Sequence, residues 1–165
     1  VNEMTSMLDS YVSFVKTESP EPIETIIINE LIGDIVKTVE KNSVELTIKE
    51  KNTIKTSGRQ IQLKRAFNNI IDNSQRYAKK IEIILYTNEK DCVIEFNDDG
   101  EGIPKNQYED VFKPFFTLDP SRNKLKGESG LGLTITRDII RSHGGDVKLS
   151  DSNLGGLQLK VLLPL

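Results

Sequence analysis

Three polar side chains of one predicted helix have the types and the spacing to hold a metal ion and a phosphate group. Asn69, Asn73 and Arg76 lie at positions i, i+4 and i+7 of a helix predicted over residues 60–78, so they form one stripe along it. An amide oxygen is a hard, neutral ligand suited to Mg²⁺, which keeps several waters and relies on substrate phosphates. A guanidinium beside it offers a fork of donors to phosphate. A solvated polar helix face has the same pattern, so the stripe needs support from other segments.

Two glycine-containing segments could bind the rest of a nucleotide. Asp98-Asp-Gly-Glu-Gly-Ile-Pro104 directly follows a predicted strand, and its glycines allow the backbone to bend tightly beside a ligand. A carboxylate at the end of a strand could accept a hydrogen bond from an exocyclic amine such as that of adenine, although a plain β-turn explains the segment equally well. Gly127-Glu-Ser-Gly-Leu-Gly-Leu133 opens another predicted helix, where backbone N–H groups and the positive dipole end favour phosphate.

A cluster of phenylalanines interrupts the long polar stretch between residues 98 and 129. Val111-Phe-Lys-Pro-Phe-Phe116 either anchors a lid or fills the core. Because more than about 12–15 residues without periodicity usually form a functional loop, we predict a lid over residues 113–128. Phe112 and Phe115 are its expected anchors.

The elements that must position these segments follow from hydrophobic periodicity. We predict a short β-branched run at 23–28, helices over 29–41, 60–78 and 130–142, a strand from residue 46 to 49, and two hairpins, 81–86 with 92–97 and 146–150 with 157–163. Asn29 is the expected N-cap of the first of these helices. This order predicts an α+β sandwich, with the helices on one face of a mixed sheet.

Composition narrows the class of protein. The chain has 165 residues, a net charge of −3, 36% hydrophobic and 28% charged residues, which is typical of one soluble globular domain. Lys and Arg are spread along the chain, so no basic footprint of a nucleic-acid-binding protein is present. The single cysteine, Cys92, excludes an internal disulfide, favours a reducing cytoplasm and is expected to be buried in a strand. No apolar run reaches the ~20 residues of a membrane span.

The first residues have a different pattern. Val1, Met4, Leu8, Tyr11 and Val15 recur at alternating three- and four-residue steps, which is typical of a helical bundle or coiled coil, although the helix could also pack on the rest of this chain. Two prolines in residues 19–22 then end the helix and indicate a linker. We therefore expect a partial bundle helix at 1–18, a linker at 19–22, a domain at 23–165, and a fragment of a larger protein.

Taken in order, the four segments resemble the N box, first glycine box, F box and second glycine box of the histidine-kinase ATPase family, which belongs to the gyrase, Hsp90, MutL and histidine-kinase fold group. The resemblance covers residues ~20–165, and residues 65–77 are similar to the N box of osmosensor kinases of the EnvZ type. It implies a two-layer α+β sandwich of three helices on a mixed five-stranded sheet, here preceded by one bundle helix.

The resemblance also implies ATP and Mg²⁺ as cofactors, and a role for each residue of the site. The nucleotide-binding residues would be Asn69, Asn73, Arg76, Tyr77, Asp98, Gly100, Gly102, Ile103, Phe115, Ser129, Gly130, Leu131, Gly132 and Leu133. Asn73 would be the Mg²⁺ ligand, and Asp98 would bind the adenine amino group. Arg76 and the lid residue Arg122 would be the catalytic contacts to phosphate, together with the backbone amides of residues 130–132.

The implied activity is transfer of phosphate to a protein histidine. Hydrolytic relatives place a Glu where this chain has Asn69, and an amide cannot act as a general base on water. The only histidine, His143, has the position of a structural residue at a helix end, so we expect no autophosphorylation of this chain. Two departures from the family, Glu128 in place of a glycine and Leu157 in place of a frequent Thr, leave open a second hypothesis, a nucleotide-binding regulatory module without kinase activity.

The implied partners are a histidine-bearing phosphotransfer hairpin, whose second helix residues 1–18 resemble, and a response regulator. The parent protein would be a homodimer, and this chain a cytoplasmic part of an inner-membrane sensor kinase, with no nucleic-acid partner and with membrane contact only through segments outside these residues.

Overall fold

The computed structural model describes residues 8, 21–39, 43–118 and 131–165. The predicted bundle helix (except Leu8), residues 119–128 of the predicted lid, and the site residues Arg122, Ser129 and Gly130 lie outside the described residues. In the parts that are described, none of the helices has the length and apolar character needed to cross a membrane.

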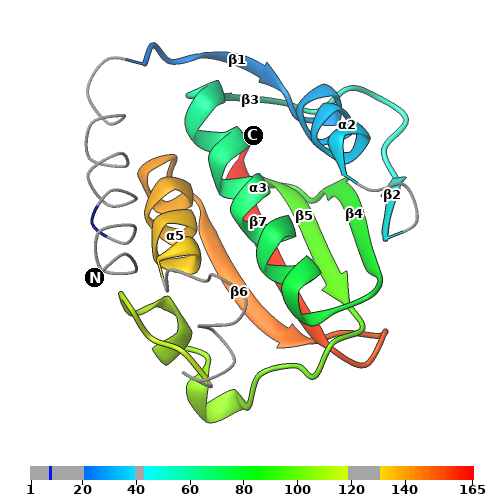
Figure 1. Cartoon of the computed structure of the whole chain (residues 1–165). Coiled ribbons are helices and arrows are strands. Elements are labelled where there is room, and N and C mark those ends of the chain that lie inside the picture. The colour runs from blue at the N-terminus through cyan, green and yellow to red at the C-terminus, as the bar shows by residue number, and fades with distance from the viewer. Residues whose placement is uncertain (1–7, 9–20, 40–42, 119–130) are drawn as a thin grey trace.

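A five-stranded sheet forms one layer of the molecule (Figure 1). Its strands in spatial order are β2 (Val44–Ile48), β4 (Ile81–Thr87), β5 (Asp91–Asp98), β7 (Leu157–Pro164) and β6 (Asp146–Asp151). Only the β2–β4 pair is parallel, so the sheet is mixed. The strands of the β4–β5 and β6–β7 hairpins begin and end within one residue of the predicted bounds.

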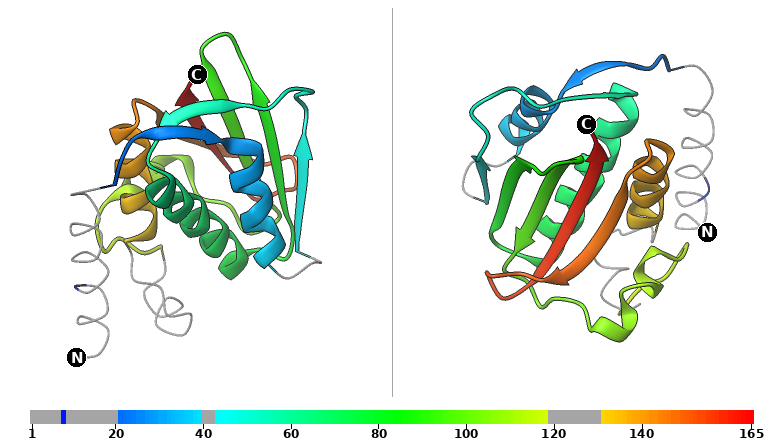
Figure 2. Two further views of the ribbon diagram at one scale, coloured as in Figure 1. Left: turned by 90° about the horizontal axis from the view of Figure 1, so that it is seen from above. Right: turned by 180° about the vertical axis from the view of Figure 1, so that it is seen from behind.

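Three α-helices cover one face of this sheet, as the two further views show (Figure 2). They are α2 (Ile28–Thr38), α3 (Gln60–Tyr77) and α5 (Gly132–Ser142). Their apolar stripes meet the inward side chains of the strands, and the rings of Phe67 on α3 and Phe96 on β5 lie 6.2 Å apart at the centre of the core. Cys92 is fully buried in β5, as predicted. The predicted α+β two-layer fold is confirmed.

A second, two-stranded sheet was only half predicted. β1 (Glu24–Ile27) pairs with β3 (Lys55–Gly58) in antiparallel fashion beside the start of α3 (Figure 1). Lys55-Thr-Ser-Gly58 carries no large apolar residue, so periodicity gave no signal for the second strand.

The predicted N-cap of the first helix is wrong. α2 begins at Ile28 without a side-chain cap and ends at Thr38 rather than at residue 41. The Asn29 side chain lies inside the first turn, and its Oδ1 accepts a hydrogen bond of 2.7 Å from the Ile54 N–H. This tertiary bond therefore replaces the local capping bond that the sequence suggested.

The start of α3 is held by residues from both ends of the chain. The Glu21 carboxylate accepts hydrogen bonds from the N–H groups of Ile61 and of Gln62, the latter at 3.2 Å. The N–H of Arg59, the residue before the helix, donates to Nε2 of His143 at 3.0 Å. A residue that we assigned to the linker thus supplies the N-cap that α3 lacks in its own sequence.

Candidate functional site

Four segments that the sequence singled out lie toward one end of the molecule, in the lower half of Figure 1. They are the C-terminal half of α3, the C-terminal end of β5, the loop that follows it and the beginning of α5. In that loop, η1 (Lys105–Gln107) and η2 (Asp110–Phe112) are single turns of 3₁₀-helix.

Asp98 is the buried carboxylate of this end, with 6% of its surface exposed. Its Oδ1 accepts hydrogen bonds from the N–H groups of Gly100, at 3.0 Å, and of Leu157, at 2.9 Å. Among the described residues no bond to Oδ2 is present, so this oxygen is the one that a ligand amine could approach. A carboxylate fixed on one oxygen by two backbone donors presents the other in a defined direction.

The close packing around Asp98 requires glycine at two positions. A Cβ on Gly156 would lie 2.1 Å from Asp98 Oδ1, and one on Gly100 would lie 2.7 Å from the Tyr77 carbonyl oxygen. Gly156 also donates its N–H to the Asp98 carbonyl at 3.0 Å. Gly100, which we predicted to shape this wall, and Gly156, which we did not, therefore allow β5, the end of α3 and the β6–β7 turn to approach one another. A Cβ on Gly102, the other predicted glycine, would lie no closer than 3.6 Å to its neighbours, although its φ of 74° favours glycine.

Asp99, which we did not single out, fastens the end of α3 to the end of β5. Its Oδ1 accepts hydrogen bonds from the N–H groups of Lys79 and Lys80 at 2.8 and 2.9 Å. These backbone donors, Lys80 first, hold the pKa of the Asp99 carboxyl below its usual value. The sequence signal was present, because an Asp-Asp-Gly segment after a strand favours side-chain bonds to nearby backbone.

The polar stripe of α3 lies at the margin of the core rather than on its most exposed face. Asn69, Asn73 and Arg76 are half-buried, whereas Lys64 and Gln75 are exposed. The stripe continues the line of Ala66, whose carbonyl accepts the hydroxyl of Thr136 on α5 at 3.4 Å. It therefore runs along the side of α3 that meets α5, which disfavours the interpretation as a solvated polar face. Tyr77, at the end of the helix, is half-buried as well.

The start of α5 supplies backbone donors to the same end. Leu131 is buried and precedes the first helical residue, Gly132. The first N–H groups of a helix have no partner within it and point along its axis, which suits phosphate. A Cβ on Gly132 would meet no atom of the described residues within 4 Å, so as far as these residues are concerned a ligand could approach this backbone closely. Leu133 and Ile103 are partly buried against the core.

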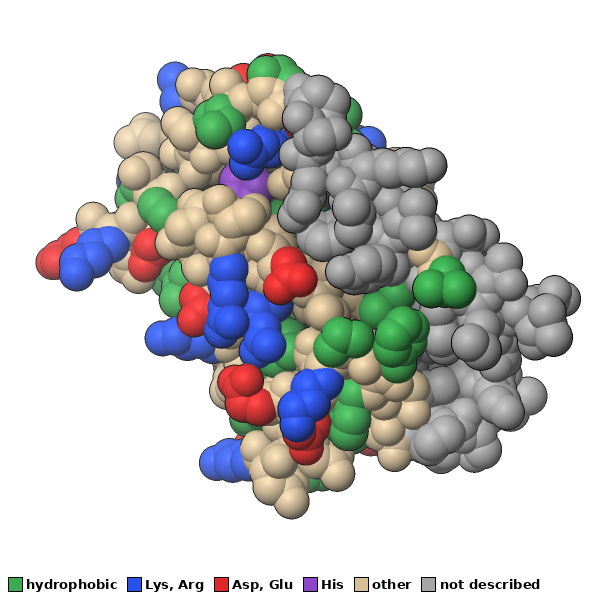
Figure 3. All heavy atoms as spheres, turned by 90° about the vertical axis from the view of Figure 1, so that its left-hand side faces the viewer, with side chains coloured by type: hydrophobic (Ala, Val, Ile, Leu, Met, Phe, Trp, Pro, Cys, Tyr) green, Lys and Arg blue, Asp and Glu red, His purple; other side chains and the backbone are tan. Residues whose placement is uncertain are grey.

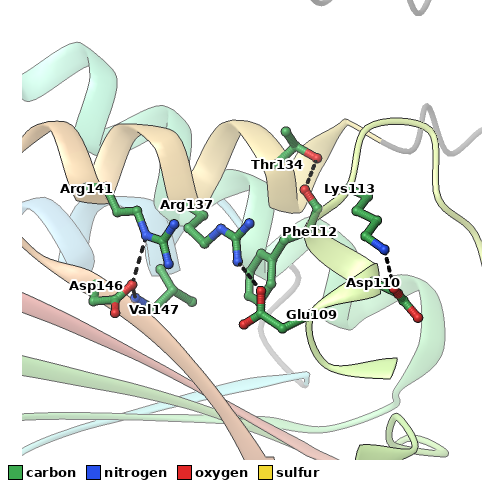
Figure 4. A network of polar contacts seen from close by, with 9 residues as sticks. All are labelled: Glu109, Asp110, Phe112, Lys113, Thr134, Arg137, Arg141, Asp146 and Val147. Carbon is green, nitrogen blue, oxygen red and sulfur yellow. Dashed lines mark hydrogen bonds and ion pairs between the residues drawn. The ribbon is translucent and has the colours of Figure 1, made fainter. Parts of the chain in front are cut away.

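The loop after β5 is attached to α5 through Phe112 (Figure 4). The Phe112 side chain is 4% exposed, and its carbonyl accepts the Thr134 hydroxyl at 2.7 Å. The Arg137 guanidinium carbon lies 4.2 Å from the centre of the Phe112 ring, and the same group pairs with Glu109 at 3.2 Å. Phe112 thus fastens the described part of this loop to α5, and the lid that it was predicted to anchor stays a prediction.

The second predicted anchor is wrong. Phe115 is 51% exposed and has a positive φ of 62°, so its side chain is not buried in the core. Phe116, one residue later, is partly buried against the core instead. In a run of two phenylalanines the sequence does not specify which ring is buried.

The same loop carries an ion pair between Lys113 and Asp110. This pair, at 2.7 Å, raises the pKa of the lysine, as expected for a cation that gains a partner.

The structure thus brings together most of the described site residues. Asp98 could bind an aromatic base that has an exocyclic amine. The polar stripe of α3 and the backbone donors of α5 could bind a phosphate chain attached to that base. Phe115, on the same loop, is 51% exposed. Sequence reasoning missed Asp99, Glu109 and Arg137, which fasten the walls to one another.

Known proteins are similar to this chain in sequence. The sequence profile of the family described as "Histidine kinase-, DNA gyrase B-, and HSP90-like ATPase" matches residues 58–165. Sensor histidine kinase CpxA of Escherichia coli strain K12 is 40% identical over 104 residues, which are 62% of this chain and 23% of CpxA. Signal transduction histidine-protein kinase BaeS of the same strain is 29% identical over 148 residues, or 87% of this chain and 32% of BaeS. The chain therefore spans about a quarter to a third of these relatives.

Solved structures share the fold. The mycobacterial sensor histidine kinase MprB superposes with a TM-score of 0.74 at 24% identity, covering 87% of this chain and 97% of the MprB chain. The catalytic domain of histidine kinase ThkA gives a TM-score of 0.72 at 22% identity, covering 87% of this chain and 97% of the other.

Proposed function

The chain belongs to the histidine kinase-, DNA gyrase B- and HSP90-like ATPase family, and from this premise we propose that it is the ATP-binding catalytic domain of a two-component sensor histidine kinase. It transfers the γ-phosphate of Mg-ATP to a histidine on a phosphotransfer helix outside this chain, for relay to a response regulator. The 40% identity to a sensor histidine kinase supports this choice among the branches of the family.

The observation that carries the proposal is the fixed Asp98 carboxylate. Because Gly100 and Leu157 occupy Oδ1, Oδ2 is directed as an acceptor for the amino group of adenine. Leu157 makes this contact through its backbone N–H. The contact is therefore independent of the side chain at this position, where many relatives have Thr. A wall built in this way distinguishes adenine, which has a donor at that position, from guanine, which has an acceptor.

The phosphates would lie between α3 and α5. Asn73 suits Mg²⁺, because its amide oxygen is a hard neutral ligand and the ion keeps waters and phosphate oxygens as its other partners. When bound, Mg²⁺ would neutralise charge on the phosphates. Asn69 and Arg76, on the same stripe, would contact phosphate directly, as would the N–H groups of Leu131 and Gly132. We assign Arg122, Ser129 and Gly130 to the same site by family resemblance.

The acceptor must come from another segment. Asn69 lacks the basicity to activate water, so the site favours transfer to an external nucleophile. His143 is the sole histidine of the chain. Its Nε2 accepts the Arg59 N–H at 3.0 Å, and its Nδ1 lies 2.7 Å from the Ile139 carbonyl, to which it donates. Both ring nitrogens are thus engaged in structural bonds.

We further propose the biological setting that this activity requires. The partners are a histidine-bearing hairpin, with a homodimeric parent protein, and a response regulator. We assign the chain to the cytoplasmic side of an inner-membrane sensor. The likeness of residues 65–77 to EnvZ-type osmosensor kinases is a proposal about the subfamily.

The first test is metal-dependent nucleotide binding. Asn73→Ala should remove most of the Mg²⁺-dependent part of ATP affinity in calorimetry, whereas Gln75→Ala, which truncates an exposed amide on the same helix, should not. An Asn73→Ala variant whose ATP affinity still responds to Mg²⁺ as the parent does would contradict the metal assignment.

The second test is phosphoryl transfer. The chain should incorporate no label from ATP by itself but should place acid-labile, base-stable label on a cognate hairpin supplied at high concentration. Label on the chain that disappears in His143→Ala would overturn the proposal.

A further inference from the structure

Two arginines on successive turns of α5 form ion pairs of equal length in different surroundings (Figure 4). Arg137 pairs with Glu109, and Arg141 pairs with Asp146, each at 3.2 Å. The Arg141 side chain is 53% exposed, whereas that of Arg137 is 18% exposed and lies over the Phe112 ring. On the surface that carries α5, basic and acidic side chains are interspersed (Figure 3), so charge pairing alone does not distinguish Arg137.

We propose that Arg137 is a positioning residue for phosphate recognition, an inference that rests on the proposed function. It holds residues 109–112 of the loop against α5 and thereby fixes the distance between the carboxylate wall at Asp98 and the backbone donors at the start of α5. Arg137 itself contacts no nucleotide; it acts through Phe112.

The contacts support this role. The loop begins at Asp98 and reaches α5 at Phe112, where it is held by the Thr134 hydroxyl and the Arg137 guanidinium, one helical turn apart. Glu109 is 84% exposed, so its ion pair alone contributes little. A guanidinium over an aromatic face is attracted more strongly when water is excluded, as it largely is at Arg137. The stacked ring is therefore the principal fastening.

Removing the guanidinium should weaken phosphate binding selectively. If Arg137→Gln leaves the two walls correctly spaced for only a fifth to a tenth of the time, the apparent Kd for ADP rises roughly five- to tenfold. Adenosine, which needs only the carboxylate wall, should bind within about twofold of the parent. Arg137→Lys keeps the cation but not the planar stacking, so the loss of ADP affinity should shrink to about two- to threefold.

The experiment compares ADP and adenosine affinities by NMR titration of the whole chain, with Arg141→Gln as the matched control. A fall in the ADP-to-adenosine affinity ratio in Arg137→Gln, partly restored in Arg137→Lys and absent in Arg141→Gln, supports the inference. An unchanged ratio overturns it, whether both affinities fall together or neither does. If Arg137→Gln does not fold in a urea titration, Arg137→Lys decides by the same ratio. A parent chain that binds neither ligand refutes the proposed function, and the inference with it.

Discussion

Asp98→Asn changes one atom of the proposed adenine wall, and the structure predicts which one. The replacing amide can turn its oxygen or its nitrogen toward the two backbone donors that now contact Oδ1. Only the oxygen accepts the N–H groups of Gly100 and Leu157, since the reverse orientation would set donor against donor. The amide NH₂ group must therefore occupy the position of Oδ2, so an acceptor becomes a donor where the base binds.

The expected cost for an adenine nucleotide follows from the lost bond. A hydrogen bond to a charged group contributes about 1.5–3 kcal/mol, and here a donor also comes to face the adenine amine. At 1.4 kcal/mol per factor of ten, ATP affinity should fall roughly 10- to 150-fold. GTP presents a carbonyl oxygen at that position, which the new NH₂ group can bind, so its affinity should fall much less or rise.

Calorimetry with ATP and GTP on the parent and on Asp98→Asn measures this change in selectivity. Asp99→Asn is the matched control, because the neighbouring carboxylate accepts hydrogen bonds from the N–H groups of Lys79 and Lys80, and its replacement should leave the ATP-to-GTP ratio unchanged. A urea titration establishes that each variant folds. Equal losses for ATP and GTP in Asp98→Asn would refute base recognition by this side chain.

Two further predictions concern regions away from the base. Glu21→Ala removes the carboxylate that caps α3, so the free energy of unfolding in urea should fall by about 0.5–2 kcal/mol; an unchanged midpoint would show that the cap is dispensable. Burial raises the pKa of the Cys92 thiol to about 12, so the folded protein at pH 8 holds almost no thiolate. Alkylation should therefore be slow until denaturant exposes Cys92, and rapid labelling of the native chain would contradict its placement in the core.

The sheet was predictable because its strands alternate strongly. In β4, Ile81, Ile83 and Leu85 are buried. In β5, Cys92, Ile94 and Phe96 join the same core, with Phe96 opposite Ile83, although further residues of this strand are buried as well. Period-two patterns joined by a short polar loop specify a hairpin and its register locally. Only the ends moved, by one residue, as at Asp98, which extends β5 by pairing with Ile81 of β4.

The errors occur where a distant segment decides a local choice. Asn29 has the composition of a cap, but Ile54, 25 residues later, provides the N–H that it binds. The strand at Lys55–Gly58 exists because β1 lies beside it, and no property of its own residues requires it. Phe115 and Phe116 are alike in sequence, and only the path of the loop over the core buries the second ring.

Within the site, too, some residues could be predicted from the sequence and others could not. Asp98 was predictable because its chemistry is carried by a side chain at a recognisable spacing after a strand. The groups that orient it were not, because Leu157 acts through its backbone N–H, which every residue except proline possesses. Arg137 likewise has an ordinary place on an amphipathic helix, and its role depends on a ring 25 residues earlier in the chain. Residues that contact a ligand are constrained in type and leave a motif, whereas residues that hold the walls together are constrained mainly in position. A substitution that looks like a departure from the family, such as Leu157, must therefore be judged by the atom it contributes to the site.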